Sequence, residues 1–382
     1  MNIGLYIHIP FCIKKCFYCS FNSVPYTPDL VQRYIDAIKQ EMVIRAKEYS
    51  LEGESLKTIY LGGGTPSILS PEAIKEIIDI TTTIFKLEEG AEITIEANPD
   101  TLGESKLADL IGIGINRISI GVQSLSDKYL MAIGRSHDAD TARRIIKTCR
   151  SVGFKNISLD LIYALPDQQL NEWLVTLEEV ISFSPEHISV YGLIIEKGTT
   201  FYHRLSNGRI KIMPEEDQID MYIAAVEMLN KAGYIHYEIS NFCLPGYSCA
   251  HNMLYWDRNE YLGIGAGAHS YIGNKRFSNT DFIEDYISKA GSGDMHSKTE
   301  ELTWRDQLVD AIIFGIRKIE GIDMDYIRRR FDADPIMLFG PSMQKLIDAD
   351  IIAIASNRIR LTPKGILLAD QAAVELLSPS HN

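Results

Sequence analysis

Three cysteines in one short stretch are the residues whose type and spacing most clearly suggest chemistry. Cys12, Cys16 and Cys19 stand in "IHIPFCIKKCFYCSFNS", residues 7–23, with the spacing C-x3-C-x2-C. Cysteine thiolates hold iron–sulfur clusters, and a complete [4Fe–4S] cube takes four of them. Three thiolates therefore leave one iron open to a substrate or a second cofactor. On spacing alone, a zinc site completed by a distant histidine, or three unrelated cysteines, is the alternative.

A glycine-rich stretch follows the second predicted strand. The segment "LGGGTPS", residues 61–67, places Gly63, Gly64 and Thr65 directly after that strand. Glycines at a strand end let a ligand approach the backbone closely, and free amides there can hold a carboxylate or an amino acid. A tight turn with no ligand is the ordinary alternative for such a sequence.

Four further polar residues stand at or just beyond predicted strand ends, where barrel proteins build their sites. They are Glu96, Gln123, Asp160 and, after a helical turn, Arg135. A carboxylate inside an otherwise apolar strand is costly unless it is paired, so Glu96 and Asp160 each need a partner. A structural ion pair inside the barrel is the alternative to a binding role for these two residues.

Short β-branched runs that alternate with longer amphipathic segments must position these side chains. Strands are predicted at 5–9, 58–62, 92–97, 117–122, 157–163 and 187–193, with helices at 28–49, 71–86, 104–112, 138–152 and 170–183. This alternation indicates β/α units and a parallel sheet. Six units predict an α/β fold built on a partial (β/α)6 barrel, because full closure takes eight.

The end of the chain predicts a small separate domain. Three short helices are expected at 302–317, 323–331 and 336–349, before the alternating stretch "IIAIASNRIRLT". This stretch predicts a two-stranded hairpin that turns at Ser356 and Asn357. The pattern is similar to a winged-helix module. Its charge is mixed and lacks a clear basic stripe, so packing or partner contact is favoured over DNA binding.

Composition excludes several classes of protein. A net charge of −13 argues against a nucleic-acid backbone as a general partner. Six cysteines among 382 residues, half of them in one loop, favour metal binding or catalysis in a reducing compartment over a disulfide scaffold. No apolar window is long enough for a transmembrane helix, and the N-terminus lacks the pattern of a signal peptide, so we expect a cytoplasmic protein.

The cysteine spacing, placed after the first strand of a β/α barrel, resembles that of the radical S-adenosylmethionine (SAM) superfamily. The context "YIHIPFCIKKCFYC" is similar to the oxygen-independent coproporphyrinogen III dehydrogenases (HemN) and to their relatives, the haem chaperone family HemW. The resemblance implies that Cys12, Cys16 and Cys19 hold a [4Fe–4S] cluster whose open iron chelates SAM. It implies SAM contacts for Tyr6, Tyr18 (through its backbone), Gly63, Gly64, Thr65, Glu96, Gln123, Arg135 and Asp160, with Gly192 a looser match.

Two departures favour the chaperone family over the dehydrogenases. The dehydrogenases have a further cysteine two residues after the third, where this chain has Phe21. They also carry a long extension before the cluster, whereas only eleven residues precede Cys12 here. We therefore expect no coproporphyrinogen dehydrogenase activity, and keep that enzyme as the alternative function.

The segment "HNMLYW", residues 251–256, lies in a predicted loop at 244–274 and resembles the chaperone signature. The resemblance implies that His251 ligates haem, although a histidine in an aromatic loop is more often only hydrogen-bonded. His269 is a second ligand candidate. Cys249 could be a soft ligand, but a buried small side chain is the simpler interpretation, as it is for Cys149 and Cys243.

The resemblance implies a haem chaperone that delivers haem to acceptor haem proteins, such as respiratory proteins at the inner membrane surface. We divide the chain into a radical SAM barrel core (1–200), a barrel extension with the haem-binding loop (201–300) and a HemN-type C-terminal domain (301–382). A regulatory or interaction protein is the rival from another class, suggested by the winged-helix-like end. Whether the cluster forms radicals or controls haem release or homodimerisation stays open.

Overall fold

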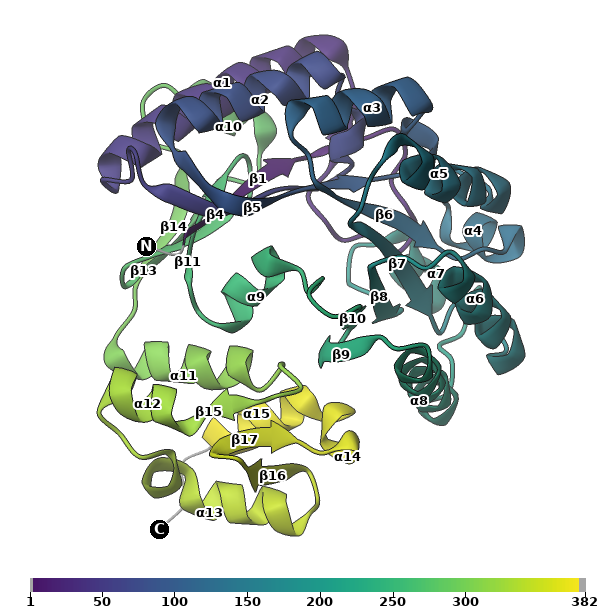
Figure 1. Cartoon of the computed structure of the whole chain (residues 1–382), viewed down its shortest axis with the longest axis vertical. Helices are drawn as coiled ribbons and strands as arrows, with labels where there is room; N and C mark the ends of the chain where they lie inside the picture. The colour runs from purple at the N-terminus through teal and green to yellow at the C-terminus, as the bar shows by residue number, and fades with distance from the viewer. Residues whose placement is uncertain (1–2, 378–382) are drawn as a thin grey trace.

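Seven parallel strands form the curved centre of the structure, a computed structural model that describes residues 3–377. In sheet order they are β11 (Glu260–Ile264), β1 (Ile3–Ile9), β4 (Ser55–Gly63), β5 (Lys86–Ala97), β6 (Arg117–Gln123), β7 (Ile157–Tyr163) and β8 (His187–Gly192). All six predicted strands are present, and β11 adds a parallel strand that was not predicted. The sheet is an open, partial barrel (Figure 1), as the sequence predicted.

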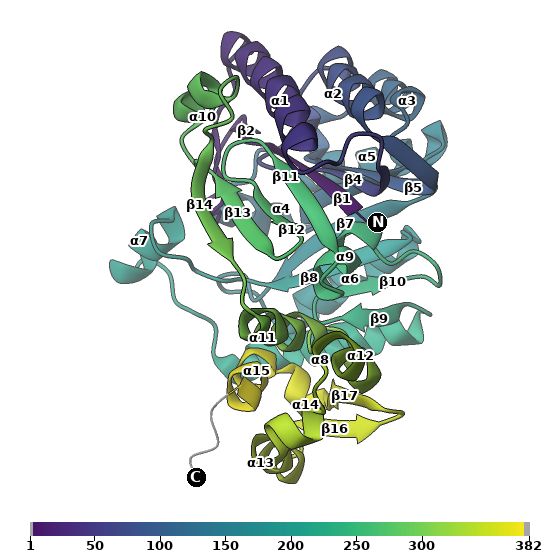
Figure 2. The same cartoon turned by 90° about the vertical axis from the view of Figure 1, so that its left-hand side faces the viewer.

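Helices cover the outer face of the parallel strands (Figures 1 and 2). They are α1 (Pro28–Glu48), α2 (Pro71–Ile84), α3 (Glu104–Ile113), α4 (Asp127–Ile133), α5 (Ala139–Val152), α6 (Leu170–Ser182) and α8 (Glu215–Lys231). Helix α7 (Thr200–Ser206) lies apart from this layer (Figure 2). Local signals set their ends: the side chains of Ser70 and Asp138 accept from backbone amides at the starts of α2 and α5. Gly153 ends α5 in the left-handed conformation at φ 111°.

Antiparallel strands extend both edges of the sheet. At one edge lie β10 (Asn241–Cys243) and β9 (Ile235–Glu238); at the other lie β12 (His269–Ile272), β13 (Lys275–Asn279) and β14 (His296–Glu301). Two short strands, β2 (Phe11–Cys12) and β3 (Val24–Pro25), pair beside the first cysteine. The prediction of a loop over 244–274 was wrong, because this segment contains helix α9 (Ala250–Trp256) as well as β11 and β12.

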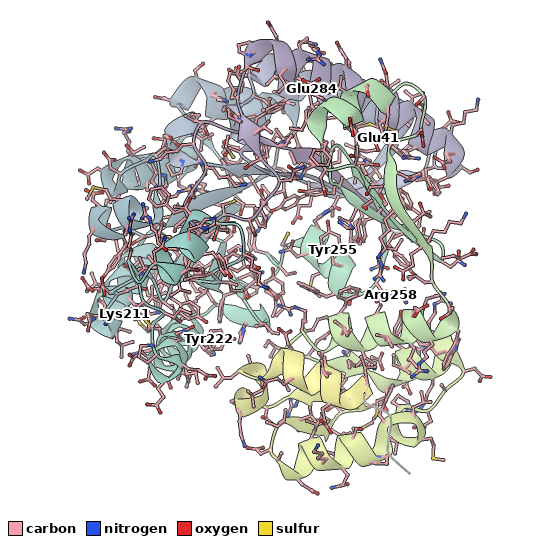
Figure 3. All side chains as sticks on the ribbon, turned by 180° about the vertical axis from the view of Figure 1, so that it is seen from behind. Glu41, Lys211, Tyr222, Tyr255, Arg258 and Glu284 are labelled. Carbon is pink, nitrogen blue, oxygen red and sulfur yellow. The ribbon has the colours of Figure 1, made fainter. Side chains whose placement is uncertain are left out.

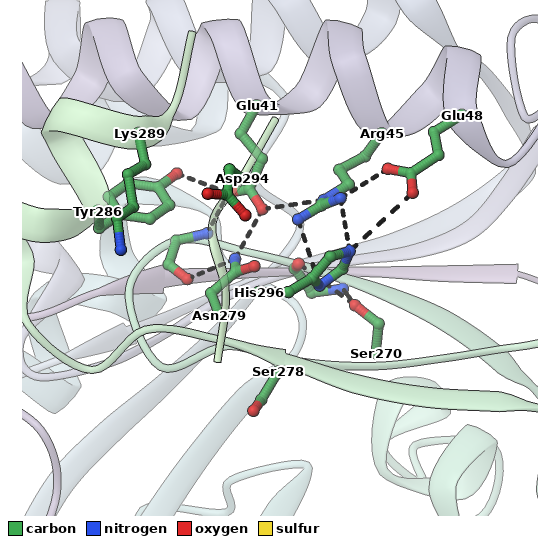
Figure 4. Close-up of polar contacts among 12 residues, drawn as sticks. Glu41, Arg45, Glu48, Ser270, Ser278, Asn279, Tyr286, Lys289, Asp294 and His296 are labelled. Carbon is green, nitrogen blue, oxygen red and sulfur yellow. Dashed lines mark hydrogen bonds and ion pairs between the residues drawn. The ribbon is translucent and has the colours of Figure 1, made fainter. Parts of the chain in front are cut away.

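Buried Glu41 holds the edge strands to the first helix (Figure 4). Its carboxylate accepts hydrogen bonds from Asn279 Nδ2 at 2.6 Å, from the Tyr286 hydroxyl at 2.6 Å and from the Gly265 amide at 2.8 Å. Tyr286 lies on α10 (Ile283–Lys289), which packs against α1. Because these three groups come from segments more than 200 residues away in the sequence, Glu41 fixes the edge that follows β11.

The C-terminal domain has its own hydrophobic cluster, drawn mainly from residues 308–376. Its elements are α11 (Trp304–Gly315), β15 (Ile322–Asp323), α12 (Met324–Phe331), α13 (Pro335–Asp348), β16 (Ile352–Ala355), β17 (Arg358–Leu361), α14 (Pro363–Ile366) and α15 (Ala369–Leu377). The predicted hairpin is confirmed, with Ser356 and Asn357 at φ 51° and 60° in its turn. Within residues 3–377, no helix is long and apolar enough to cross a membrane.

Candidate cofactor site

The three loop cysteines lie at one wall of a cavity at the carboxyl ends of the barrel strands. All three are free thiols and only partly buried. Cys12 Sγ lies 3.5 Å from Thr65 Oγ1, and Arg135 donates from Nη1 to Cys16 Sγ at 3.5 Å. The cysteine loop is therefore anchored to the glycine loop and to a cation. The thiolate is the form of cysteine that binds metals.

The glycine loop, residues 61–65, packs directly against the cysteine loop. The amides of Gly64 and Thr65 donate to the carbonyls of Ile9 and Phe11 at 2.9 and 2.8 Å. A Cβ atom on Gly64 would lie only 2.8 Å from the Phe11 carbonyl oxygen, so a side chain at this position would push the loops apart. Glycine is therefore required for the close approach, while Gly63 also adopts φ 115°.

Glu96 and Asp160 are paired with hydrogen-bond donors rather than with cations. Glu96 accepts from the Tyr60 hydroxyl at 2.8 Å and from the Gly63 amide at 2.9 Å. Asp160 accepts from Ser119 and Ser189 hydroxyls at 2.9 and 2.7 Å. Burial in the barrel raises the pKa of both carboxyl groups. The structural ion pair considered from the sequence is therefore absent at these two residues, which keep capacity for a cationic ligand.

Gln123 and Arg135 complete the rim of the cavity. Gln123 ends β6 with a left-handed φ of 62°, an uncommon conformation for a residue other than glycine. Arg135 follows α4 and donates from Nη2 to Asn98 Oδ1 and to the Gly121 carbonyl, while its buried Nε has no hydrogen-bond partner among the described residues. This unpaired donor leaves hydrogen-bonding capacity beside the cysteine loop.

The cavity has a volume of about 580 Å³ and brings together most of the predicted site residues. Those that line it are Cys12, Cys16, Tyr18, Cys19, Gly63, Gly64, Thr65, Glu96, Gln123, Arg135, Asp160 and Gly192. Tyr6 and His251 are not among the lining residues. Tyr6 lies behind the wall, with its hydroxyl 3.0 Å from His8 Nδ1.

His251 is buried on helix α9 rather than displayed in a loop, with an exposed fraction of 1%. Its Nδ1 is 2.7 Å from Thr58 Oγ1, and its Nε2 is 2.9 Å from the Tyr255 hydroxyl. Burial, together with the charge of Arg117, lowers the pKa of His251 to about 3. Neither ring nitrogen is free to ligate a metal in this conformation.

Helix α9 lies inside the curve of the sheet and faces the C-terminal domain (Figure 1). It contacts β1, β4, β11 and α11. Tyr255 on this helix lies between the sheet and the C-terminal domain, and Arg258 lies just beyond the helix, toward α11 (Figure 3). Arg258 donates from Nη1 to the Gln307 carbonyl at 2.8 Å and so links α9 to α11. The "HNMLYW" segment therefore lies between the barrel strands and helix α11 of the C-terminal domain.

The other histidine and cysteine candidates lie elsewhere. His269 is exposed on β12 and does not line the cavity. Cys249 is buried, and its thiol donates to Glu92 Oε1 at 3.5 Å, so the interpretation as a buried small side chain is confirmed. Cys149 and Cys243 are also buried, as predicted.

Several cavity residues were missed from the sequence, chiefly Tyr60, Asn98, Arg117, Ser119, His187 and Ser189. Arg117 and Ser119 alternate along β6 with buried isoleucines, so both side chains point into the barrel. Polar residues at every second position of an apolar strand were the signal that could have revealed them. Tyr60 directly precedes the glycine loop and was not singled out from the sequence.

The residues present fit a thiolate-bound cluster with an amino-acid ligand beside it. Cys12, Cys16 and Cys19 present three free thiols from one loop at the wall of the cavity. The polar groups beside them suit SAM: the Glu96 carboxylate can accept from an ammonium group, and the unpaired Arg135 Nε can donate to an anionic group. A bound [4Fe–4S] cluster would supply the open iron for such a ligand.

Comparison with known proteins agrees with this geometry. The family model of the radical SAM superfamily matches residues 6–180, and that of the HemN C-terminal domain matches residues 302–368. The coproporphyrinogen III oxidase HemN from Escherichia coli, a radical SAM enzyme, has the same fold: its TM-score is 0.86 at 24% identity, covering 98% of this chain and 90% of that one.

Two relatives with higher sequence identity share one name. Heme chaperone HemW from Lactococcus lactis is 35% identical over 99% of this chain and 98% of its own length. Heme chaperone HemW from Bacillus subtilis is 36% identical over 96% and 97%, respectively. Membership of the radical SAM superfamily implies a [4Fe–4S] cluster and SAM as cofactors. At this identity and coverage, the chain belongs to the Heme chaperone HemW family within the radical SAM superfamily.

Proposed function

We propose that the chain is a haem chaperone that carries a [4Fe–4S] cluster and SAM, binds haem and passes it to acceptor haem proteins. In this proposal Cys12, Cys16 and Cys19 hold the cluster, and the other polar residues of the cavity hold SAM. The observation that carries the haem-binding part is the position of α9, which places the "HNMLYW" segment directly behind the cavity wall. The relatives named as haem chaperones support the same conclusion.

We propose that His251 is the haem ligand and that ligation requires a local rearrangement. The Tyr255 hydroxyl, 2.9 Å from Nε2, occupies the position that a haem iron would need. Loss of this contact would free Nε2 while Thr58 still holds Nδ1. A partner on the second ring nitrogen orients a metal-binding imidazole, so Thr58 suits a role as the orienting group.

The test is a haem titration followed by absorbance, on anaerobically reconstituted protein. We expect saturable binding with a Soret shift in the native chain, loss of that shift in His251→Ala, and tighter binding in Tyr255→Phe, which frees Nε2. Oxidative decarboxylation of coproporphyrinogen III by the same preparation would overturn the chaperone function in favour of the dehydrogenase. Haem binding unchanged in His251→Ala would overturn the ligand assignment alone.

We further propose a cytoplasmic location, because thiolates that hold an iron–sulfur cluster persist in a reducing compartment. Delivery to acceptors at the inner membrane surface, a homodimeric state and the three-part division at residues 200 and 300 remain parts of the proposal. Fractionation of cells, together with sedimentation of the reconstituted protein with and without its cluster, tests the location and the dimer.

A further inference from the structure

Tyr60 contacts the cofactor cavity on one side and His251 on the other. Its hydroxyl donates to Glu96 Oε1 at 2.8 Å, and the residue lines the cavity. Its ring stacks on the His251 imidazole, with centroids 5.0 Å apart and planes at 24°. One side chain therefore separates the carboxylate proposed to bind SAM from the imidazole proposed to bind haem.

The packing around Tyr60 leaves little free space. A Cβ atom on Gly62 would lie 2.9 Å from the Tyr60 ring and 3.2 Å from Glu96 Cδ. A Cβ atom on Gly4 would lie 3.3 Å from His251 Cε1. Two glycines thus make room for the carboxylate and the two rings, and a close-packed group of this kind transmits displacement rather than absorbing it.

The arrangement of Glu96, Tyr60 and His251 in the structure favours SAM over haem. Glu96 is oriented by Tyr60 and by the Gly63 amide, so its carboxylate is already placed in the cavity. His251 is held by Thr58 and Tyr255 and has no free ring nitrogen. If the imidazole turned toward haem about its Nδ1 contact with Thr58, it would leave the surface on which Tyr60 packs, and with it the support that orients Glu96 would be lost.

We propose that Tyr60 is a positioning residue that makes SAM binding and haem ligation oppose each other. The inference rests on the proposed function, since it takes Glu96 as a SAM contact and His251 as the haem ligand. A ligand shifts an equilibrium only by its differential affinity for two states. SAM favours the state in which His251 is stacked on Tyr60, and haem favours the state in which the ring, still held by Thr58, has turned away from Tyr60. By linkage, each ligand weakens the other by the same factor.

The experiment measures the dissociation constant of haem with and without saturating SAM, on protein whose cluster is kept oxidised so that SAM is not consumed. In the native chain we expect SAM to weaken haem binding about five-fold or more, and haem to weaken SAM binding equally. Tyr60→Phe keeps the ring and removes the hydroxyl. In this variant the ratio of the haem dissociation constants measured with and without SAM should fall toward one. Tyr234→Phe is the matched control, because it removes a buried hydroxyl that donates to the Pro185 carbonyl outside the cavity.

The outcomes separate this inference from the proposed function. A native chain that binds no haem overturns the proposed function, and the inference with it. Haem binding that SAM leaves unchanged or strengthens overturns the inference alone. If SAM changes the haem dissociation constant by the same factor in Tyr60→Phe as in Tyr234→Phe, the role of Tyr60 is overturned. Equilibrium dialysis of labelled SAM confirms saturation in each variant, so loss of SAM binding is not mistaken for loss of coupling.

Discussion

Glu92 and His251 are 159 positions apart in the sequence, yet Glu92 Oε1 accepts a hydrogen bond from the His251 amide at 3.2 Å. Glu92 Oε2 accepts from the Ala250 amide at 3.1 Å. Four residues further along the same strand, Glu96 enters the cofactor cavity, because alternate residues of a strand share a face. A single strand thus supplies the carboxylate that fixes α9 and the carboxylate proposed to bind SAM.

The first prediction concerns the start of α9. Glu92→Ala leaves the amides of Ala250 and His251 without acceptors in a partly buried place, so the free energy of unfolding should fall by about 2 kcal/mol. Hydrogen exchange should become faster across 250–256. Glu104→Ala, at an exposed position in the first turn of α3, is the control. Equal exchange in both variants would show that Glu92 does not hold the helix.

The second prediction separates the three loop cysteines from the buried Cys149 and Cys243. Replacement of Cys12, Cys16 or Cys19 by serine should remove the iron and the visible absorbance of the cluster from reconstituted protein, because each thiolate is a proposed ligand. Cys149→Ala and Cys243→Ala should keep the full iron content and lower only the stability, by about 1 kcal/mol, because they remove buried sulfur atoms. Full iron content in any one loop variant would contradict the proposed ligand set.

The third prediction tests the contact between the glycine and cysteine loops. Gly64→Ala would place a methyl group 2.8 Å from the Phe11 carbonyl oxygen, so the free energy of unfolding should fall by about 1–3 kcal/mol and cluster assembly should slow. Gly103→Ala has nothing within 4 Å of its new methyl group and serves as the control. Urea unfolding and the rate of iron incorporation are measured for both. If Gly64→Ala behaves like the control, the close approach has no energetic consequence.

The fourth prediction concerns Glu96. Glu96→Gln removes a carboxylate whose pKa is raised by burial, so the protein without cofactors should be as stable as the native chain or slightly more stable at pH 7. SAM should bind about ten-fold or more weakly, because the proposed charge-assisted hydrogen bond to its ammonium group is lost. Isothermal titration with SAM and urea unfolding give the two quantities. Unchanged SAM affinity would exclude Glu96 as a contact.

The sequence predicted those parts of the fold and site that local signals define. β-Branched runs marked six parallel strands, and the turn residues Ser356 and Asn357 marked the hairpin. Helix α9 was missed because seven residues are too few for a periodic pattern, and its start is stabilised by Glu92 from a distant strand. Tyr60 was missed for a similar reason: its importance comes from contacts with Glu96 and His251 that only the folded chain brings together.

The last prediction is the acid sensitivity that buried His251 produces. Its pKa is about 3 in the folded chain, against an ordinary value of 6.5, so between these values the unfolded chain binds one more proton there. The free energy of unfolding therefore rises with pH in this window, and acidification costs about 1.4 kcal/mol per pH unit from this residue. His251→Gln lacks the titrating group.

Urea unfolding of the cofactor-free protein at pH 6.0 and pH 4.5 measures this effect. The native chain should lose about 2 kcal/mol more stability between the two pH values than His251→Gln does. His203→Gln, at an exposed position on α7, should lose as much as the native chain. If His251→Gln loses as much as His203→Gln, the imidazole is protonated in the folded chain. The stacked, doubly hydrogen-bonded state, on which the opposition between SAM and haem depends, would then be excluded.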